Sequence, residues 1–118
     1  MERMIERTLS FAKIRVYVKC LGSDYQIVVE GGERPHLGSA VLAIPRPSLS
    51  GDGSASCTSS VINVPGHKDE QICRILAECV AIKKNAVAMC TGGFHVDRIT
   101  NEQIEEVIEV MGEIAGEI

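Results

Sequence analysis

Three histidines have the residue type and the surroundings that binding chemistry needs. His36, His67 and His95 each stand beside or next but one to glycine or proline, in segments predicted to be loops or ends of elements. A neutral imidazole is the commonest metal ligand, and it also bonds to polar ligands. Separations of 31 and 28 residues match no local metal motif, so taken singly each histidine is more simply a surface residue. We predict that folding brings all three to one shared metal ion or ligand, with Glu33 as a further metal ligand.

Two glycine pairs and one helix start point toward an anion or a flavin. The pairs at 31–32 and 92–93 permit positive φ and close backbone approach, which suits flavin contact and an ordinary tight turn equally well. Lys68 stands at the start of a predicted helix, whose exposed N–H groups attract phosphate. Ser59 and Ser60 lie on the strand predicted before it. Helix starts are common, so this pattern alone does not define a phosphate site.

Catalysis and pure protein binding stay open as alternatives. Three histidines, an activated water and Glu33 or Asp97 as base would make a small metal-dependent hydrolase, although a chain this short offers little room for a deep pocket. Five cysteines also allow a thiol nucleophile with a histidine partner, but Cys73 and Cys79 are most simply core residues of a helix. An assembly factor without a small ligand would instead use strand edges or the acidic last helix.

Composition limits the class of protein. A net charge of -4, two Phe, two Tyr and no Trp disfavour a nucleic-acid binder, which needs excess positive charge and stacking aromatics. Five cysteines without a Cys-x-x-Cys pair indicate reduced thiols rather than a disulfide framework or a zinc ribbon. The first residues mix acids and bases, unlike a secretory signal, and the apolar runs at 40–44 and 86–90 are too short to span a bilayer. We expect a cytoplasmic protein without membrane partners.

The first half of the chain reads as strands. Apolar and charged residues alternate over 10–20, which predicts a half-buried strand, and an antiparallel hairpin connects it to a second strand at 25–29. The run at 40–44 is apolar at every position, which predicts a strand covered on both faces and ended by Pro45 and Pro47. The Ser/Gly-rich stretch at 48–56 predicts a surface loop.

The second half alternates strands and helices. A strand at 57–64, a helix from about His67 to Lys84 with Asn85 as its cap, and a strand at 86–90 predict a crossover with parallel pairing. The residues from Thr91 to His95 are predicted to lie beyond that strand. Thr100 and Gln103 form a capping box for a last helix, whose apolar stripe is Ile104, Val107, Ile108, Met111, Ile114 and Ala115.

Three segments, each centred on a histidine, together resemble the LpdD-like family of prenylated flavin chaperones: residues 31–38 (GGERPHLG), 65–70 (PGHKDE) and 92–100 (GGFHVDRIT). They occur in order over nearly the whole domain. The stretch around Asp52 departs from the family pattern. The resemblance implies an α/β (α+β) fold like that of the proteasome assembly chaperones: one domain over residues 1–118, with a mixed sheet of about five to six strands and two main helices.

The resemblance also implies a function. Such a protein would be a non-catalytic, homodimeric carrier of prenylated FMN, or of FMN, that assists a UbiD-like decarboxylase. In this hypothesis a divalent metal ion joins the site. The metal ligands are assigned to His36, His67, His95 and Glu33, and the flavin contacts to Ser59, Ser60, Lys68, Gly92, Gly93 and Arg98.

Overall fold

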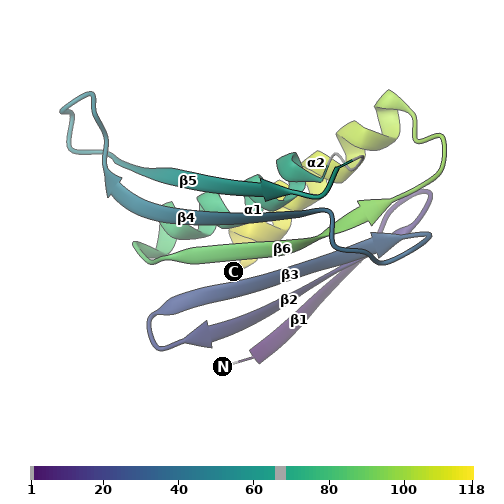
Figure 1. Cartoon of the computed structure of the whole chain (residues 1–118), viewed down its shortest axis with the longest axis horizontal. Coiled ribbons are helices and arrows are strands. Elements are labelled where there is room, and N and C mark those ends of the chain that lie inside the picture. The colour runs from purple at the N-terminus through teal and green to yellow at the C-terminus, as the bar shows by residue number, and fades with distance from the viewer. Residues whose placement is uncertain (1, 66–68) are drawn as a thin grey trace.

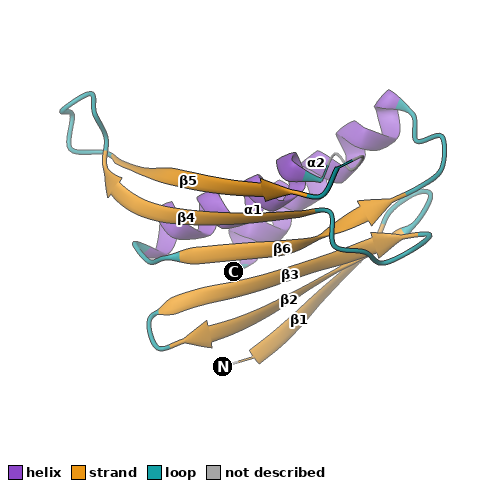
Figure 2. Ribbon diagram, viewed as in Figure 1, coloured by secondary structure: helices purple, strands orange, loops and turns teal. Residues whose placement is uncertain are grey.

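The computed structural model describes residues 2–65 and 69–118, which form a mixed six-stranded sheet with two helices on one of its faces (Figures 1 and 2). The elements are β1 (Glu2–Thr8), β2 (Lys13–Leu21), β3 (Asp24–Gly32), β4 (Ser39–Pro47), β5 (Ala55–Asn63), α1 (Glu70–Lys84), β6 (Ala88–His95) and α2 (Asn101–Glu117). The sheet order is β1-β2-β3-β6-β4-β5, and only the β3–β6 pair is parallel. The predicted fold class is confirmed.

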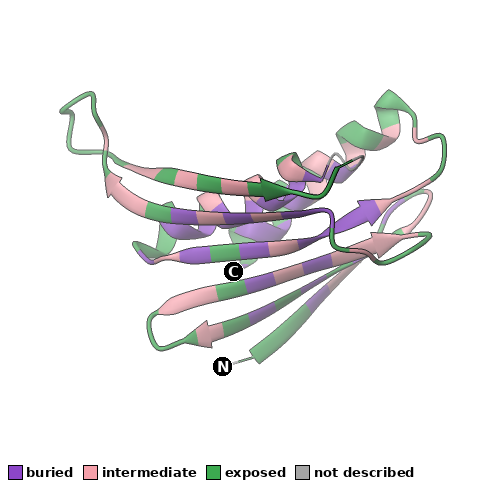
Figure 3. Ribbon diagram, viewed as in Figure 1, coloured by how far each residue is buried: buried purple, intermediate pink, exposed green. Residues whose placement is uncertain are grey.

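The core lies between the sheet and the helices (Figure 3). Ile14, Val16 and Val18 of β2 are buried beneath the helices, while the residues between them are exposed, as the period-two pattern predicts. The predicted antiparallel hairpin of β2 and β3 is also confirmed, and Gly22 adopts φ 63° in its turn. Alternating polarity therefore determined which face of these strands carries the helices.

Strand β1 is a feature that the sequence pattern did not predict. Its open face carries Glu2 and Glu6, which pair with Lys19 and Arg15 of β2 at 3.3 and 2.6 Å. Ile5 is buried on the opposite face. Because most positions of β1 are polar and its charges are balanced by the neighbouring strand, no alternating apolar signal marks it.

Strand β4 differs from its prediction in two ways. Val41 and Ala43 are buried toward α1, but Ile44 is 47% exposed, so the strand is fully covered on one face only. It also continues through Pro45 and Pro47. Pairing with β6 ends at Ala43, and beyond it β4 pairs only with β5, so a missing N–H is tolerated along this open edge.

The predicted crossover is correct in direction but wrong in pairing. Strands β5 and β6 run parallel, but β4 lies between them, and β6 pairs in parallel with β3 instead. Strand β6 also extends to His95, so Gly92 and Gly93 lie inside it rather than beyond it. Gly92 has φ 128°, and a Cβ there would lie 1.8 Å from the Val29 carbonyl oxygen. Close approach of β3, not a turn, requires this glycine.

The helix ends follow their local signals more closely. Asn85 caps α1 in the left-handed region, as predicted, although α1 begins at Glu70 and the predicted first residues 67 and 68 lie outside the described part of the chain. The capping box of Thr100 and Gln103 is present at the start of α2. Val107, Met111, Ile114 and Ala115 of the predicted stripe are buried, whereas Ile104 is 38% exposed.

The capping box gives a first testable prediction. Thr100→Ala removes the hydroxyl that accepts from the Gln103 N–H, so we expect a loss of about 1 kcal/mol in the free energy of unfolding. Urea denaturation monitored by circular dichroism measures it. Ser60→Ala, at an exposed strand position, is the control and should change stability by less than about 0.5 kcal/mol. Equal stability of the two variants would contradict a role for the cap.

Candidate functional site

A buried carboxylate forms the centre of the candidate site. Asp69, directly before α1, is 4% exposed. Its Oδ2 accepts a hydrogen bond from His36 Nε2 at 2.7 Å, and its Oδ1 accepts one from the Phe94 backbone N–H at 2.9 Å. A buried charge is costly unless such bonds compensate it. Asp69 therefore links the β3–β4 loop, the end of β6 and the start of α1.

Two glycines make room for this pair. A Cβ at Gly93 would lie 2.7 Å from His36 Nε2 and 2.8 Å from Asp69 Oδ2. At Gly38 it would lie 1.8 Å from the same carboxylate oxygen. Any larger residue at either position would displace the pair, so Gly93 supports the site by its small size.

His95 joins His36 at the same edge of the sheet. The two rings meet edge to face, with centroids 6.0 Å apart. His95 Nε2 lies 2.8 Å from Asp97 Oδ1 and 3.2 Å from Arg34 Nη2. One ring nitrogen cannot donate to the carboxylate and accept from the guanidinium at once, so the tautomer decides between these bonds. The hydrogen bond from His95, aided by the charge of Arg34, lowers the pKa of Asp97.

The structure brings together part of the predicted metal set. His36 and His95 are neighbours, and the Glu33 backbone N–H bonds to the His95 carbonyl at 2.7 Å. His67 lies outside the described residues. Within residues 2–65 and 69–118, no group of three His, Cys, Asp or Glu side chains is arranged to hold a metal ion. The two Nε2 atoms face different carboxylates, so a shared ion needs other ring nitrogens or must displace these bonds.

The residues predicted to contact the flavin lie further apart than the predicted metal ligands. Ser59 bonds to Glu78 of α1, and Ser60 is exposed near the middle of β5, level with Leu42. Asn63, three residues and about 10 Å further along β5 at 3.3 Å per residue, is level with Ser39 and Gly92, and His95 lies three residues beyond Gly92 on β6. Arg98 is exposed at φ 57° in the loop before α2, close in sequence to His95, and Lys68 lies outside the described residues.

Sequence reasoning missed the partners of the histidines. Neither Asp69 nor Arg34 is among the site residues that the sequence predicts. Gly38, which follows His36 closely, was the available signal, because a glycine there permits close approach. The identity of the approaching group could not be read from it, since Asp69 is 33 residues from His36 in the chain.

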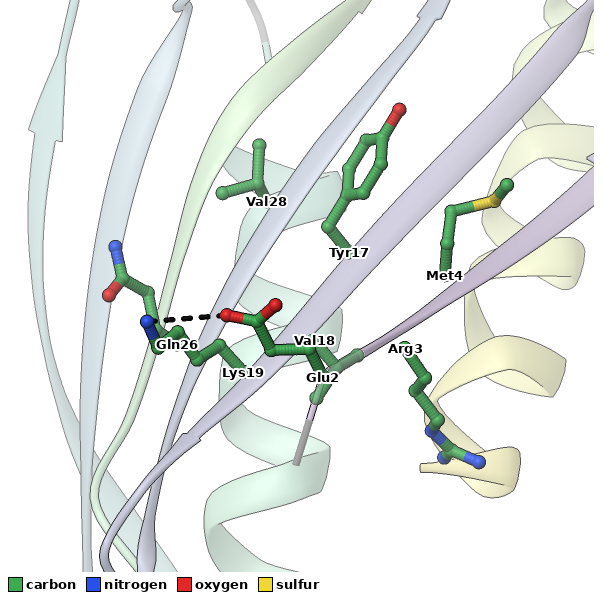
Figure 4. Close-up of a pocket in the computed structure, with 8 residues that line it drawn as sticks. All are labelled: Glu2, Arg3, Met4, Tyr17, Val18, Lys19, Gln26 and Val28. Carbon is green, nitrogen blue, oxygen red and sulfur yellow. Dashed lines mark ion pairs between the residues drawn. The ribbon is translucent and has the colours of Figure 1, made fainter.

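A pocket of about 380 Å³ opens beside this cluster, between the end of β6 and α2. Asp69, His95 and Gln71 line it on the polar side. Its apolar lining includes Phe94, Val96, Ile99, Ile104, Val107 and Ile108. A larger hollow of about 620 Å³ lies over β1, β2 and β3 and contains Met4, Tyr17 and Val28 (Figure 4), but no histidine. The pocket next to the histidines is therefore the candidate binding site.

Comparison with known families decides the assignment. Residues 10–118 match the model of the prenylated flavin chaperone LpdD-like domain. The chain belongs to the LpdD-like family. The predicted resemblance is thereby confirmed, and the histidine cluster with its pocket falls inside the LpdD-like domain.

The fold has a wider relationship. The LpdD-like chain is similar to a chain in a crystal structure of a novel chaperone complex for yeast 20S proteasome assembly, with a TM-score of 0.58 and 15% identity over 98% of this chain and 93% of that one. At this identity the likeness shows the fold alone. No curated protein matches the LpdD-like chain. Neither of the two helices in the described part of the chain is long and apolar enough to cross a membrane.

The two Asp–His pairs give a matched prediction. Asp69→Asn removes the buried charge and one of its two bonds, so we expect a loss of about 2–4 kcal/mol in the free energy of unfolding. Asp97→Asn alters a pair whose carboxylate is 65% exposed to solvent, so its loss of stability should be clearly smaller. Urea denaturation of both variants measures the difference. Equal losses would show that burial of Asp69 does not matter.

Proposed function

We propose that this chain is a non-catalytic carrier that binds prenylated FMN and delivers it to a UbiD-like decarboxylase. The supporting observation is the contact of an apolar pocket with the His36–His95 pair, within an LpdD-like domain. The flavin, when bound, supplies the electron-accepting ring system. The chain supplies a partly enclosed place for it.

The residues present fit such a group. A flavin has a flat, largely apolar ring system with polar edges, and it carries a phosphate. The pocket offers apolar walls for the rings, while Arg34 and His95 offer hydrogen-bond donors at its rim. Arg34 Nη2 lies 3.2 Å from His95 Nε2 and 3.5 Å from Asp97 Oδ1, and 70% of the Arg34 side chain is exposed. In this proposal Arg34 and Arg98 attract the phosphate, with Lys68 as a further candidate.

A divalent metal ion at His36, His67, His95 and Glu33 stays a prediction. Metal-binding histidines commonly donate one ring N–H to a carboxylate and coordinate the ion through the other ring nitrogen. His36 Nε2 bonds to Asp69 in this way, so in this proposal Nδ1 is the coordinating nitrogen. In the described structure that Nδ1 lies 3.3 Å from the Arg34 carbonyl oxygen, a long contact that an ion would displace.

The five cysteines are all free thiols, which is consistent with the proposed cytoplasmic location.

Binding of the flavin can be measured directly. Under anaerobic conditions, titration of the full chain with prenylated FMN should quench flavin fluorescence at a stoichiometric end point. His95→Gln should weaken binding about tenfold, because it removes a charged or hydrogen-bonding contact worth about 1.4 kcal/mol. Ser50→Ala, at an exposed position of the β4–β5 loop, should bind like the wild type. No binding by the wild type, or unchanged binding by His95→Gln, would contradict the carrier role of this site.

A homodimer is the second part of the proposal, and it uses the sheet face that carries no helix. Apolar side chains form a band across that face: Met4, Tyr17, Val28, Met89, Leu42, Ile44 and Ile62. Six strands, each about 4.8 Å wide and about nine residues long, cover roughly 800 Å². A stable dimer needs roughly 800 Å² per partner, so the face is large enough for a second copy.

The dimer has its own test. Met89→Lys places a charge near the centre of this face and should convert a dimer into a monomer in size-exclusion chromatography with light scattering, at unchanged circular dichroism. Leu49→Lys, at an 89% exposed position of the β4–β5 loop, should leave the mass unchanged. A monomeric wild type, or a dimer that survives Met89→Lys, would exclude this interface.

A further inference from the structure

The apolar stripe of α2 is buried in only part of its length. Val107, Met111 and Ile114 are buried in the core, whereas Ile104 is 38% exposed and Ile108 is half-buried. Both of the latter side chains line the 380 Å³ pocket. The first turns of α2 therefore hold apolar surface above a hollow that the described side chains do not fill.

The pocket is continuous with the histidine cluster. His95 lines it and at the same time meets the ring of His36 edge to face. Asp69 also lines it, but both of its carboxylate oxygens already accept hydrogen bonds, from His36 and from the Phe94 N–H. A ligand bound at the histidines would therefore extend into the apolar part of the pocket.

The described lining of the pocket does not favour a phosphate in its interior. Among the described lining residues there is no lysine or arginine, and Asp69 would repel an anion. Arg34 stands outside the lining, at the His95 rim. The interior thus suits an uncharged hydrocarbon group, while polar and charged parts of a ligand remain at the rim. A volume of about 380 Å³ is near the small end of ligand pockets, which span about 300–1,000 Å³.

We infer that this pocket holds the prenyl-derived hydrocarbon of the flavin and makes the protein prefer prenylated FMN over FMN. The inference rests on the proposed function and adds the part of the molecule that α2 recognises. Ile104 and Ile108 are the specificity-determining side chains. Each buried methylene group contributes about fourfold in affinity, so burial of two or more gives a preference of about tenfold or greater.

The test compares two isoleucines of nearly equal exposure. Ile104→Gln changes the pocket, and Ile82→Gln changes a residue that is 39% exposed on α1 and does not line the pocket. Ile82 is ten residues beyond Ile72, about 15 Å along the helix. Anaerobic titrations of the wild type and both variants with prenylated FMN and with FMN give two dissociation constants for each protein.

We expect the wild type to bind prenylated FMN at least about tenfold more tightly than FMN, Ile104→Gln to lose about five- to tenfold of that preference, and Ile82→Gln to keep it. A preference that Ile104→Gln retains, or an equal loss for both flavins, overturns the inference while leaving the carrier function intact.

A second ligand separates failure of the inference from failure of the proposed function. If the wild type binds neither flavin, the proposed function fails, and dimethylallyl monophosphate then tests the pocket by saturation-transfer NMR. Methyl signals that the wild type and Ile82→Gln show and Ile104→Gln lacks support a hydrocarbon site. Signals absent from the wild type overturn it.

Discussion

The buried carboxylate of Asp69 is the constraint on which the rest of the site depends. A charge removed from water must be compensated, and here one oxygen bonds to His36 and the other to the Phe94 N–H. These bonds fix three segments that are distant in sequence. They also explain why Gly38 and Gly93 lack side chains, since a Cβ at either would occupy the space of the pair. Positioned in this way, β6 carries His95 to the wall of the pocket.

The sheet separates two surfaces of different character. Both helices cover one face, and the pocket lies at the margin of that covered side, where the carboxyl ends of β3 and β6 meet. Such strand ends are the usual place for ligands in open α/β sheets. The other face presents apolar side chains between paired charges. The likeness to the proteasome assembly chaperone structure concerns this framework alone, since sites and not folds determine function.

The sequence correctly predicted those features that depend on residues close together in the chain. The alternation in β2, the β2–β3 hairpin and the capping box of Thr100 each depend on neighbours in sequence, and each was correct. Strand order, the existence of β1 and the extent of β6 depend on distant partners, and they were missed. Glycine often marks turns, so the sequence predicts that Gly92 lies beyond the strand. In the structure Gly92 lies inside β6, where close contact with Val29 leaves no room for a side chain. His36 and His95 were found from their loop settings, whereas Asp69 was not, because its bonds are long-range.

Strand β6 also determines when the sheet can be completed during synthesis of the chain. Strands β1 to β3 form one antiparallel unit and β4 with β5 another, and β6 joins them, although it comes after all five in the chain. A nascent polypeptide emerging from the ribosome therefore has two separate partial sheets until residues 88–95 have been made. Such late, non-local closure slows folding and leaves unpaired strand edges exposed to aggregation. The same eight residues end in His95, so completion of the sheet also brings His95 beside His36.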